Sequence, residues 1–276
     1  MAKSEWMEGK YRRFLTEGRG QGAGKEYVPW TKTYEFSSMG RATRILGIKT
    51  GRIHHLHSDL QLRAFLIFEF SHRVQDIMEC FPLIDVKAVI DDHEDLRFDK
   101  FCNKETREQM VITTNFLLAV KDSDENEKYV ARTVKNSTEL TRKITFEKLE
   151  IERRYWLAKD IEWKVVTDKQ LPKQLARNIE WVRDTLLDRE GDRVEKEQLS
   201  VILHKHLLDN PHIVLRDLLK QFDKTEGVPK GTGLYLFRYL VATKELRIDM
   251  NSAIDFSKKI SHLLPYIKGI ESHEDL

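Results

Sequence analysis

The strongest constraint on the fold is a pair of strand-like segments that flank a short polar turn. Residues 113–120 and 128–135 are rich in Thr, Val, Tyr, Phe and Leu, whereas residues 122–127 between them are polar. This pattern is typical of a β-hairpin. Because alternate residues of a strand share a face, we expect the side chains of Thr133 and Lys135 on one side of the sheet.

Elements expected around this hairpin complete a mixed α/β core. Ser58 suits a helix N-cap and Gln61, three residues on, completes a capping box, which favours a helix over 58–70. Residues 1–50 are expected to be irregular. The remaining expected elements are a strand over 83–90, a polar loop over 91–108, a helix over 144–159 and a strand over 163–167.

A change of pattern near Leu171-Pro172 predicts a domain boundary. We expect one domain over 1–170 and a second, mostly helical domain over 171–276. Apolar spacing predicts helices over 175–187, 199–208, 214–222 and 231–242, followed by a β-like segment over 246–249. Short helices followed by a β-like segment are typical of a winged-helix module, which can bind either DNA or protein.

Composition narrows the class of protein. The chain has 276 residues, of which 40% are hydrophobic, enough for two globular cores. No apolar run approaches ~20 residues, so no membrane span is expected, and the first residues lack the apolar core of a signal peptide. The two cysteines, Cys80 and Cys102, suggest neither a disulfide framework nor a zinc site, so we expect a reducing cytosolic location.

Basic charge is concentrated near the N-terminus. Residues 1–55 hold 11 Lys/Arg against 5 Asp/Glu, although the net charge of the chain is only +2. The glycine-rich segment 18–25 is expected to be a flexible basic loop. It is not a P-loop, because no Gly-Lys-Ser/Thr sequence follows at the required spacing. The structural alternatives to DNA binding are that the basic segment is a solvated arm and that the histidines pack against a loop. The candidates for contact with DNA phosphates are Arg19, Lys25, His54, His55 and His57.

The hairpin has the skeleton on which metal-dependent nucleases carry their catalytic groups. Phosphodiester hydrolysis uses a metal ion to polarise the phosphate and to supply hydroxide near neutral pH. Magnesium prefers carboxylate oxygens and water as ligands, and a nearby lysine can stabilise the developing charge. In this chain Asn115 and Thr133 stand where metal-binding side chains would lie, with Lys135 two residues further on.

Several short sequence motifs, in the same order along the chain, resemble those of the TnsA family. Members of this family are the endonuclease subunits of heteromeric cut-and-paste transposases. They cover residues 18 to about 181, and the resemblance of the last third rests mainly on its helical pattern. The matching motifs are GRGQG (18–22), YVPW (27–30), HHLHSDL (54–60), EKLEIERRYW (147–156) and NIEW (178–181).

This resemblance implies a restriction-endonuclease-like N-terminal domain and a winged-helix-like C-terminal domain. It also implies a subunit that nicks the 5′ strands at transposon ends with Mg²⁺ or Mn²⁺. Its implied partners are transposon-end DNA, a TnsB-like transposase that cuts and joins the 3′ strands, and a TnsC-like AAA+ ATPase that contacts the C-terminal domain. The implied location is the bacterial cytosol, at the nucleoid when bound to DNA.

The resemblance also implies that the catalytic positions have changed. Gln61 stands where the family has Glu, Asn115 where it has Asp, and Thr133 where it has Gln. Lys135 is retained, and Glu152 matches a further acidic position near the metals. Because an amide is a poor magnesium ligand, we expect weak metal binding and little or no nuclease activity. Natural drift and engineering would both produce such a chain.

Structural interpretations of the same residues stay open at this point. Gln61 could serve only the capping box, Lys135 could be a solvated charge, and Glu152 could simply pair with Lys148. One functional alternative is a non-catalytic assembly module that joins the ATPase and the second transposase on DNA, in which case transposition would give cointegrates. Another is an active nuclease that uses Glu152, Asp59 and a backbone carbonyl.

Overall fold

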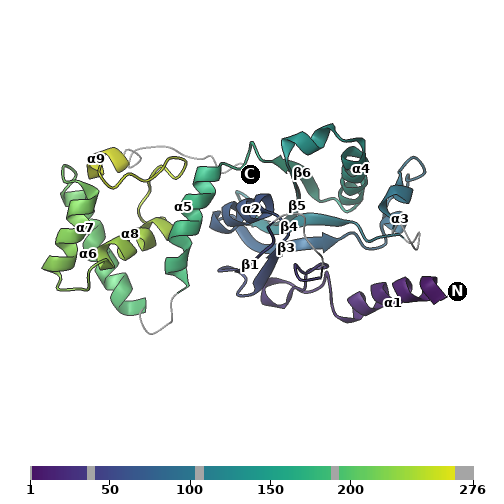
Figure 1. Ribbon diagram of the computed structural model, residues 1–276, viewed down its shortest axis with the longest axis horizontal. Coiled ribbons are helices and arrows are strands. Elements are labelled where there is room, and N and C mark those ends of the chain that lie inside the picture. The colour runs from purple at the N-terminus through teal and green to yellow at the C-terminus, as the bar shows by residue number, and fades with distance from the viewer. Residues whose placement is uncertain (1, 36–40, 103–108, 188–192, 265–276) are drawn as a thin grey trace. The chain divides into compact units, whose positions relative to one another are not determined.

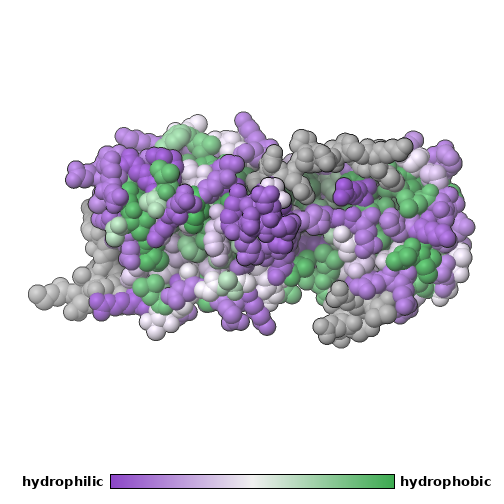
Figure 2. Space-filling model, turned by 180° about the vertical axis from the view of Figure 1, so that it is seen from behind, coloured by the Kyte–Doolittle hydropathy of each residue, from purple (hydrophilic) through white to green (hydrophobic). Residues whose placement is uncertain are grey.

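The computed structural model describes residues 2–35, 41–102, 109–187 and 193–264, and it divides into two compact units, residues 1–171 and 172–276 (Figure 1). Residues 103–108 of the expected polar loop lie outside the described residues. Across the described ranges, no helix is both long and apolar enough to span a membrane. The face seen in Figure 2 is mainly hydrophilic, with apolar residues in separate groups.

A four-stranded sheet forms the centre of the N-terminal unit (Figure 1). β3, β4 and β5 are antiparallel neighbours, and β6 runs parallel to β5. The predicted hairpin is β4–β5 and is confirmed, with Asp122 Oδ1 accepting backbone N–H bonds across its turn. In spatial order the strands are β3 (Val74–Pro82), β4 (Thr113–Lys121), β5 (Glu127–Lys135) and β6 (Glu162–Thr167).

Two helices cover opposite faces of this sheet. Phe116 of β4 packs against Phe68 of α2 (Asp59–Phe70), with ring centroids 5.5 Å apart. The next residue, Leu117, joins a core cluster with Ile151 of α4 (Lys143–Ala158). Because successive strand residues point to opposite faces, α2 and α4 lie on opposite sides. Both helices were predicted and are confirmed.

The expectation that residues 1–50 are irregular is wrong. α1 (Ala2–Thr16) is a helix, and β1 (Thr43–Leu46) pairs antiparallel with β2 (Ile53–Leu56). Gly9 lowers the helix propensity of the first segment and interrupts its pattern. The strand β1 is short, and only alternate residues of it are partly buried, so its sequence signal is weak.

The predicted strand over 83–90 is also wrong. The strand lies earlier, as β3, and Asp85 adopts a left-handed conformation with φ 50° before the short helix α3 (Val86–Val89). β3 was missed because Asp76 and Glu79 interrupt its apolar pattern, although both side chains are buried. A 3₁₀ turn over Phe98–Phe101 follows, and a second one over Ser137–Thr141 connects β5 to α4.

The glycine-rich segment 18–25 is packed rather than a free arm. Gly20 donates its N–H to Val28 O at 2.7 Å, and Gly24 donates to Asp76 Oδ2 of β3 at the same distance. Gly20 has φ +74°, and a Cβ there would overlap the Pro82 ring. These glycines therefore allow the loop to close against β3 before the 3₁₀ turn Gly24–Glu26.

The C-terminal unit is helical, and its predicted helices are confirmed. The expected β-like segment over 246–249 is irregular instead, because Leu246 N donates to Leu240 O at 2.9 Å and the chain folds back on the preceding helix. Among the described residues of this unit, strand-type pairing is confined to a bridge between Val214 and Lys259. The helices are α5 (Lys173–Arg183), the 3₁₀ turn Asp184–Leu186, α6 (Arg193–Asp209), α7 (Leu215–Thr225), α8 (Thr232–Ala242) and α9 (Ile260–Leu263).

Candidate active site

The candidate site begins where β4 and β5 stop pairing. Their register runs from Lys121 opposite Glu127 to Phe116 opposite Arg132 and goes no further. The next residue of β4, Asn115, uses its side chain instead, and its Oδ1 accepts the backbone N–H of Val134 at 2.8 Å. β5 stays paired with β6 as far as Lys135, and β4 stays paired with β3 as far as Thr113, so the two strands separate only from one another here. This separation places residue 115 beside Thr133 and Val134.

Thr133 and Glu152 form the centre of a buried hydrogen-bond network. Both side chains have 0% exposure, and Thr133 Oγ1 donates to Glu152 Oε2. Thr114 Oγ1 donates to the same oxygen at 2.9 Å. Each hydroxyl accepts an indole N–H in turn, from Trp156 at 2.7 Å to Thr114 and from Trp163 at 3.0 Å to Thr133. The carboxylate thus ties α4 to β4, β5 and β6.

The other oxygen of Glu152 is neutralised by a lysine one helical turn earlier. Lys148 Nζ lies 2.9 Å from Glu152 Oε1 and donates also to Thr113 O, at 2.9 Å. The ion pair between Lys148 and Glu152 that the i,i+4 spacing suggests is therefore formed. An ammonium group sits at this carboxylate, and both carboxylate oxygens have partners.

The other two predicted catalytic side chains make separate contacts. Lys135 Nζ lies 3.6 Å from Glu139 Oε2, and its side chain is 22% exposed. Gln61 Oε1 accepts the N–H of His57 at 2.8 Å, while Ser58 Oγ accepts the N–H of Gln61 at 3.2 Å. The predicted N-cap is confirmed, with Gln61 reaching one residue further back than a capping box does. Within the described ranges, no hydrogen bond joins Gln61 or Lys135 to Asn115, Thr133 or Glu152.

The donor set does not fit a magnesium ion, which prefers charged oxygen ligands. Asn115 and Gln61 offer amide oxygens that already accept backbone N–H groups. The carboxylate of Glu152 is shared by a lysine and two hydroxyls, and Asp59, the alternative ligand, is exposed. No group of three His, Cys, Asp or Glu side chains that could hold a metal occurs among the residues that the structure describes.

Arg19, predicted to contact DNA, is instead an internal side chain with 5% exposure. Its two terminal nitrogens bind both carboxylate oxygens of Glu35, at 2.8 and 2.6 Å, and one of them donates also to Trp30 O. The guanidinium carbon lies 3.5 Å from the ring centroid of Phe14. Its DNA contact stays a prediction, and net charge along the sequence did not reveal a partner 16 residues away.

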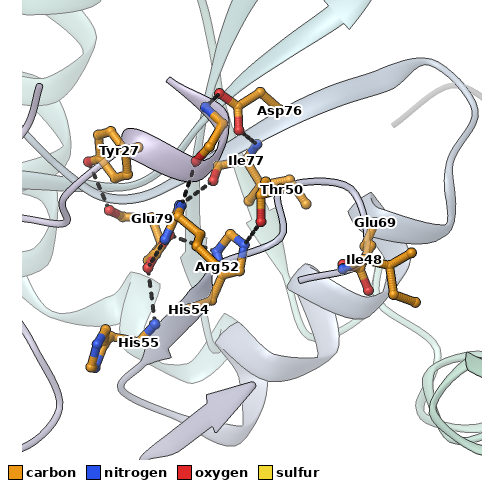
Figure 3. Close-up of polar contacts among 11 residues, drawn as sticks. Tyr27, Ile48, Thr50, Arg52, His54, His55, Glu69, Asp76, Ile77 and Glu79 are labelled. Atoms are coloured by element: carbon orange, nitrogen blue, oxygen red, sulfur yellow. Dashed lines mark hydrogen bonds and ion pairs between the residues drawn. The ribbon is translucent and has the colours of Figure 1, made fainter. Parts of the chain in front are cut away.

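His54 and His55, predicted to face DNA, are buried around Glu79 (Figure 3). Glu79 accepts hydrogen bonds from His54 Nδ1 at 2.8 Å, from His55 N at 3.0 Å and from both terminal nitrogens of Arg52 at 2.9 and 2.6 Å. Burial would raise the pKa of the Glu79 carboxyl, but the hydrogen bonds from His54 and Arg52 outweigh it and hold the pKa at about 2. Burial lowers the pKa of His55. Both histidines pack inside the fold, and their DNA contact stays a prediction.

The same arginine fixes the glycine-rich loop. Arg52 Nε donates to Gly24 O at 3.1 Å, and Arg52 Nη2 donates to Ile77 O at 2.7 Å (Figure 3). Lys25, next to Gly24, is exposed, so its predicted DNA contact stays a prediction. His57 is half-buried and hydrogen-bonded to Thr31 at 3.1 Å, and its DNA contact also stays a prediction.

Comparison with known proteins identifies the family. Two family models match: TnsA-like endonuclease N terminal over residues 71–168 and TnsA endonuclease C terminal over residues 170–250. The chain is also 34% identical over 270 residues to the Transposon Tn7 transposition protein TnsA of Escherichia coli, covering 93% of this chain and 92% of that protein. The two family models match parts of both structural units, and the chain belongs to the TnsA family.

Proposed function

We propose that this chain is a TnsA-type subunit of a DNA transposase whose cleavage site is impaired. It would bind transposon ends beside a TnsB-like transposase and be recruited through its C-terminal unit by a TnsC-like ATPase. The observation that carries the impairment is that Gln61 and Asn115 offer only amide oxygens, which already accept backbone N–H groups. The two oxygens of Glu152 are in turn occupied by Lys148, Thr114 and Thr133. A carboxylate held in this way has little left to offer a metal ion.

Charge at positions 61 and 115 supports the same proposal. If the family places acids there, Gln61 and Asn115 remove two negative charges from the place where a divalent ion would bind. Two charges about 4 Å apart interact by about 4 kcal/mol at the effective dielectric of a protein surface, so each lost carboxylate is a large loss of affinity. Without a bound metal the site lacks the group that would activate water, and Lys135 alone cannot replace it.

A non-catalytic assembly subunit is the second candidate. It is favoured by the completeness of the network around Glu152, because Trp156 and Trp163 satisfy both threonine hydroxyls and leave a self-contained structural unit. A transposon that depends on such a subunit would keep its 5′ strands attached and would move as a cointegrate.

The test is strand-specific nicking of transposon-end DNA by the assembled transposase with Mg²⁺ or Mn²⁺. The chain is compared with a Gln61→Glu/Asn115→Asp variant and with the same variant carrying Lys135→Ala as an inactive control. Nicking of the 5′ strands by the double variant alone supports an impaired nuclease. Nicking by both would overturn the assignment of these positions, and nicking by neither would favour the assembly subunit, with cointegrates as its product.

A further inference from the structure

Several basic side chains of the N-terminal unit lie against carboxylates, which neutralise their charge within the fold. Ion pairs at 2.9 Å or less include Arg19–Glu35, Arg52–Glu79, Arg132–Glu162, Lys148–Glu152 and Arg154–Asp95. Basic side chains that are exposed and lie together on one surface are better candidates for binding an anion.

Helix α7 of the C-terminal unit carries such charge on its outer side. Its apolar residues Leu215, Leu218, Leu219 and Phe222 are buried in the core of the unit. The opposite side presents three exposed cations four residues apart, Arg216, Lys220 and Lys224, which span about 12 Å of the helix. Because i and i+4 residues are neighbours on a helix, the three form one line.

A second segment adds two lysines beside the start of this line. Leu215 N donates to Lys258 O at 3.0 Å, and a β-bridge joins Val214 to Lys259. Lys258 and Lys259 are both exposed. We call the five side chains Arg216, Lys220, Lys224, Lys258 and Lys259 the α7 cationic face.

Acidic side chains compensate this face only weakly. Asp217 lies 3.7 Å from Arg216, and both side chains are 58% exposed, so the pair is weak. The carboxylate of Asp255 is engaged by Ser257, whose N–H and Oγ lie 2.9 and 2.6 Å away. In the part of the chain that the structure describes, none of the four lysines of the face has a carboxylate within 4.0 Å.

We propose that the α7 cationic face binds the sugar-phosphate backbone of duplex DNA without reading its sequence. Lysines and arginines, together with hydroxyl and amide side chains, are the groups that contact phosphates, and Gln221 and Thr225 lie exposed on the same helix. An interface with a protein would instead be enriched in aromatic residues and depleted in lysine. The inference rests on the proposed function only in taking DNA as the ligand, and it does not depend on cleavage.

The α7 cationic face would place DNA affinity in the C-terminal unit. Arg19, His54 and His55 are buried, so three of the five positions predicted in the N-terminal unit do not present a cation to solvent. Duplex DNA carries one negative charge per about 1.7 Å of its axis, so every cation along a 12 Å line has a phosphate within reach. The C-terminal unit would thus hold the DNA whether or not the N-terminal unit can cut it.

The test measures binding of the full chain to a fluorescent duplex of arbitrary sequence across a salt titration. A Lys220→Gln/Lys224→Gln/Lys259→Gln variant is compared with a control of equal charge, Lys128→Gln/Lys143→Gln/Lys169→Gln, whose three lysines are exposed in the N-terminal unit. The proposal predicts that the slope of log affinity against log salt falls by about 2 to 3 in the first variant and stays unchanged in the control. Thermal melting checks that all three proteins are folded.

Other outcomes overturn the inference. Equal loss of slope in the two variants would mean that only net charge matters, and an unchanged slope in the first would exclude the face as a DNA contact. Unchanged DNA binding combined with lost transposition would assign the face to an acidic protein instead. Because nicking by the Gln61→Glu/Asn115→Asp variant is measured separately, failure of this inference and failure of the proposed function are distinguishable.

Discussion

The side-chain oxygen of Asn115 accepts the backbone N–H of Val134 at 2.8 Å, at the point where β4 and β5 separate. An aspartate at this position would offer an oxygen with the same geometry. The fold therefore requires only a hydrogen-bond acceptor at residue 115, whereas a magnesium site requires a negatively charged ligand there. An amide provides the acceptor but not the charge, so Asn at this position keeps the fold whether or not the site binds a metal.

Removing the acceptor should therefore open the hairpin locally, and restoring the charge should not. In Asn115→Leu the Val134 N–H loses its partner, which costs about 1 to 3 kcal/mol. In Asn115→Asp the bond remains. Hydrogen exchange of the Val134 amide measures the difference, and we expect faster exchange in the leucine variant alone. Equal protection in both variants would show that the bond contributes nothing.

The Glu152 network should matter more to stability than to any reaction. In Glu152→Gln the new NH₂ group faces either the ammonium of Lys148, donor against donor, or the hydroxyls of Thr114 and Thr133, which then lose the acceptor for their hydrogens. We expect a loss of about 2 to 4 kcal/mol in the free energy of unfolding of the N-terminal unit, measured in urea.

Glu150 on the same helix provides the control for this prediction, because its carboxylate lies at the surface, where it pairs with Arg153 and Arg154. Glu150→Gln should cost about 0.5 kcal/mol, since a surface ion pair contributes little. An equal cost in the two variants would contradict a special role for the Glu152 network.

The sequence predicted the elements whose patterns are local and strong. The hairpin and α4 follow from alternation and helical spacing, and the Lys148–Glu152 pair follows from i,i+4 geometry. β3 was not predicted because a glutamate within a strand, such as Glu79, suggests an exposed position. Its partners Arg52 and His54 are 25 or more residues away in the sequence, so the sequence alone does not show that Glu79 is buried. Exposure, which decides whether a basic residue can meet DNA, is likewise fixed by distant partners rather than by spacing.

Acid should unfold the N-terminal unit partly through Glu79. Its pKa is held at about 2, below the ordinary 4.5, because hydrogen bonds from His54 and Arg52 outweigh the effect of burial. A carboxyl with a lowered pKa stabilises the fold above pH 4.5 and loses that contribution as the pH falls toward 2, with a total of about 3 kcal/mol.

The comparison for this prediction is the Glu79→Gln variant, followed by circular dichroism from pH 7 to pH 2. We expect it to be less stable at pH 7 and to show a flatter dependence of stability on pH between 4.5 and 2. A parallel pH dependence in the two proteins would show that other carboxylates control acid unfolding.

Arg19 and Lys25, six residues apart in the chain, should differ in how neutralising their charge affects stability and DNA binding. Arg19 binds Glu35 through two hydrogen bonds and stacks on Phe14, so Arg19→Gln leaves Glu35 without its partner and should cost about 2 to 3 kcal/mol of stability. Lys25 is exposed, and Lys25→Gln should leave the unfolding free energy within about 0.5 kcal/mol.

The salt dependence of DNA binding separates the two roles. If Lys25 contacts a phosphate, Lys25→Gln lowers the slope of log affinity against log salt by about 1, whereas Arg19→Gln leaves the slope unchanged under conditions where it is folded. Urea unfolding and the salt titration are made on the same two variants. A lowered slope in the folded Arg19→Gln protein would mean that its guanidinium leaves Glu35 to reach DNA, and the internal role assigned to it would be wrong.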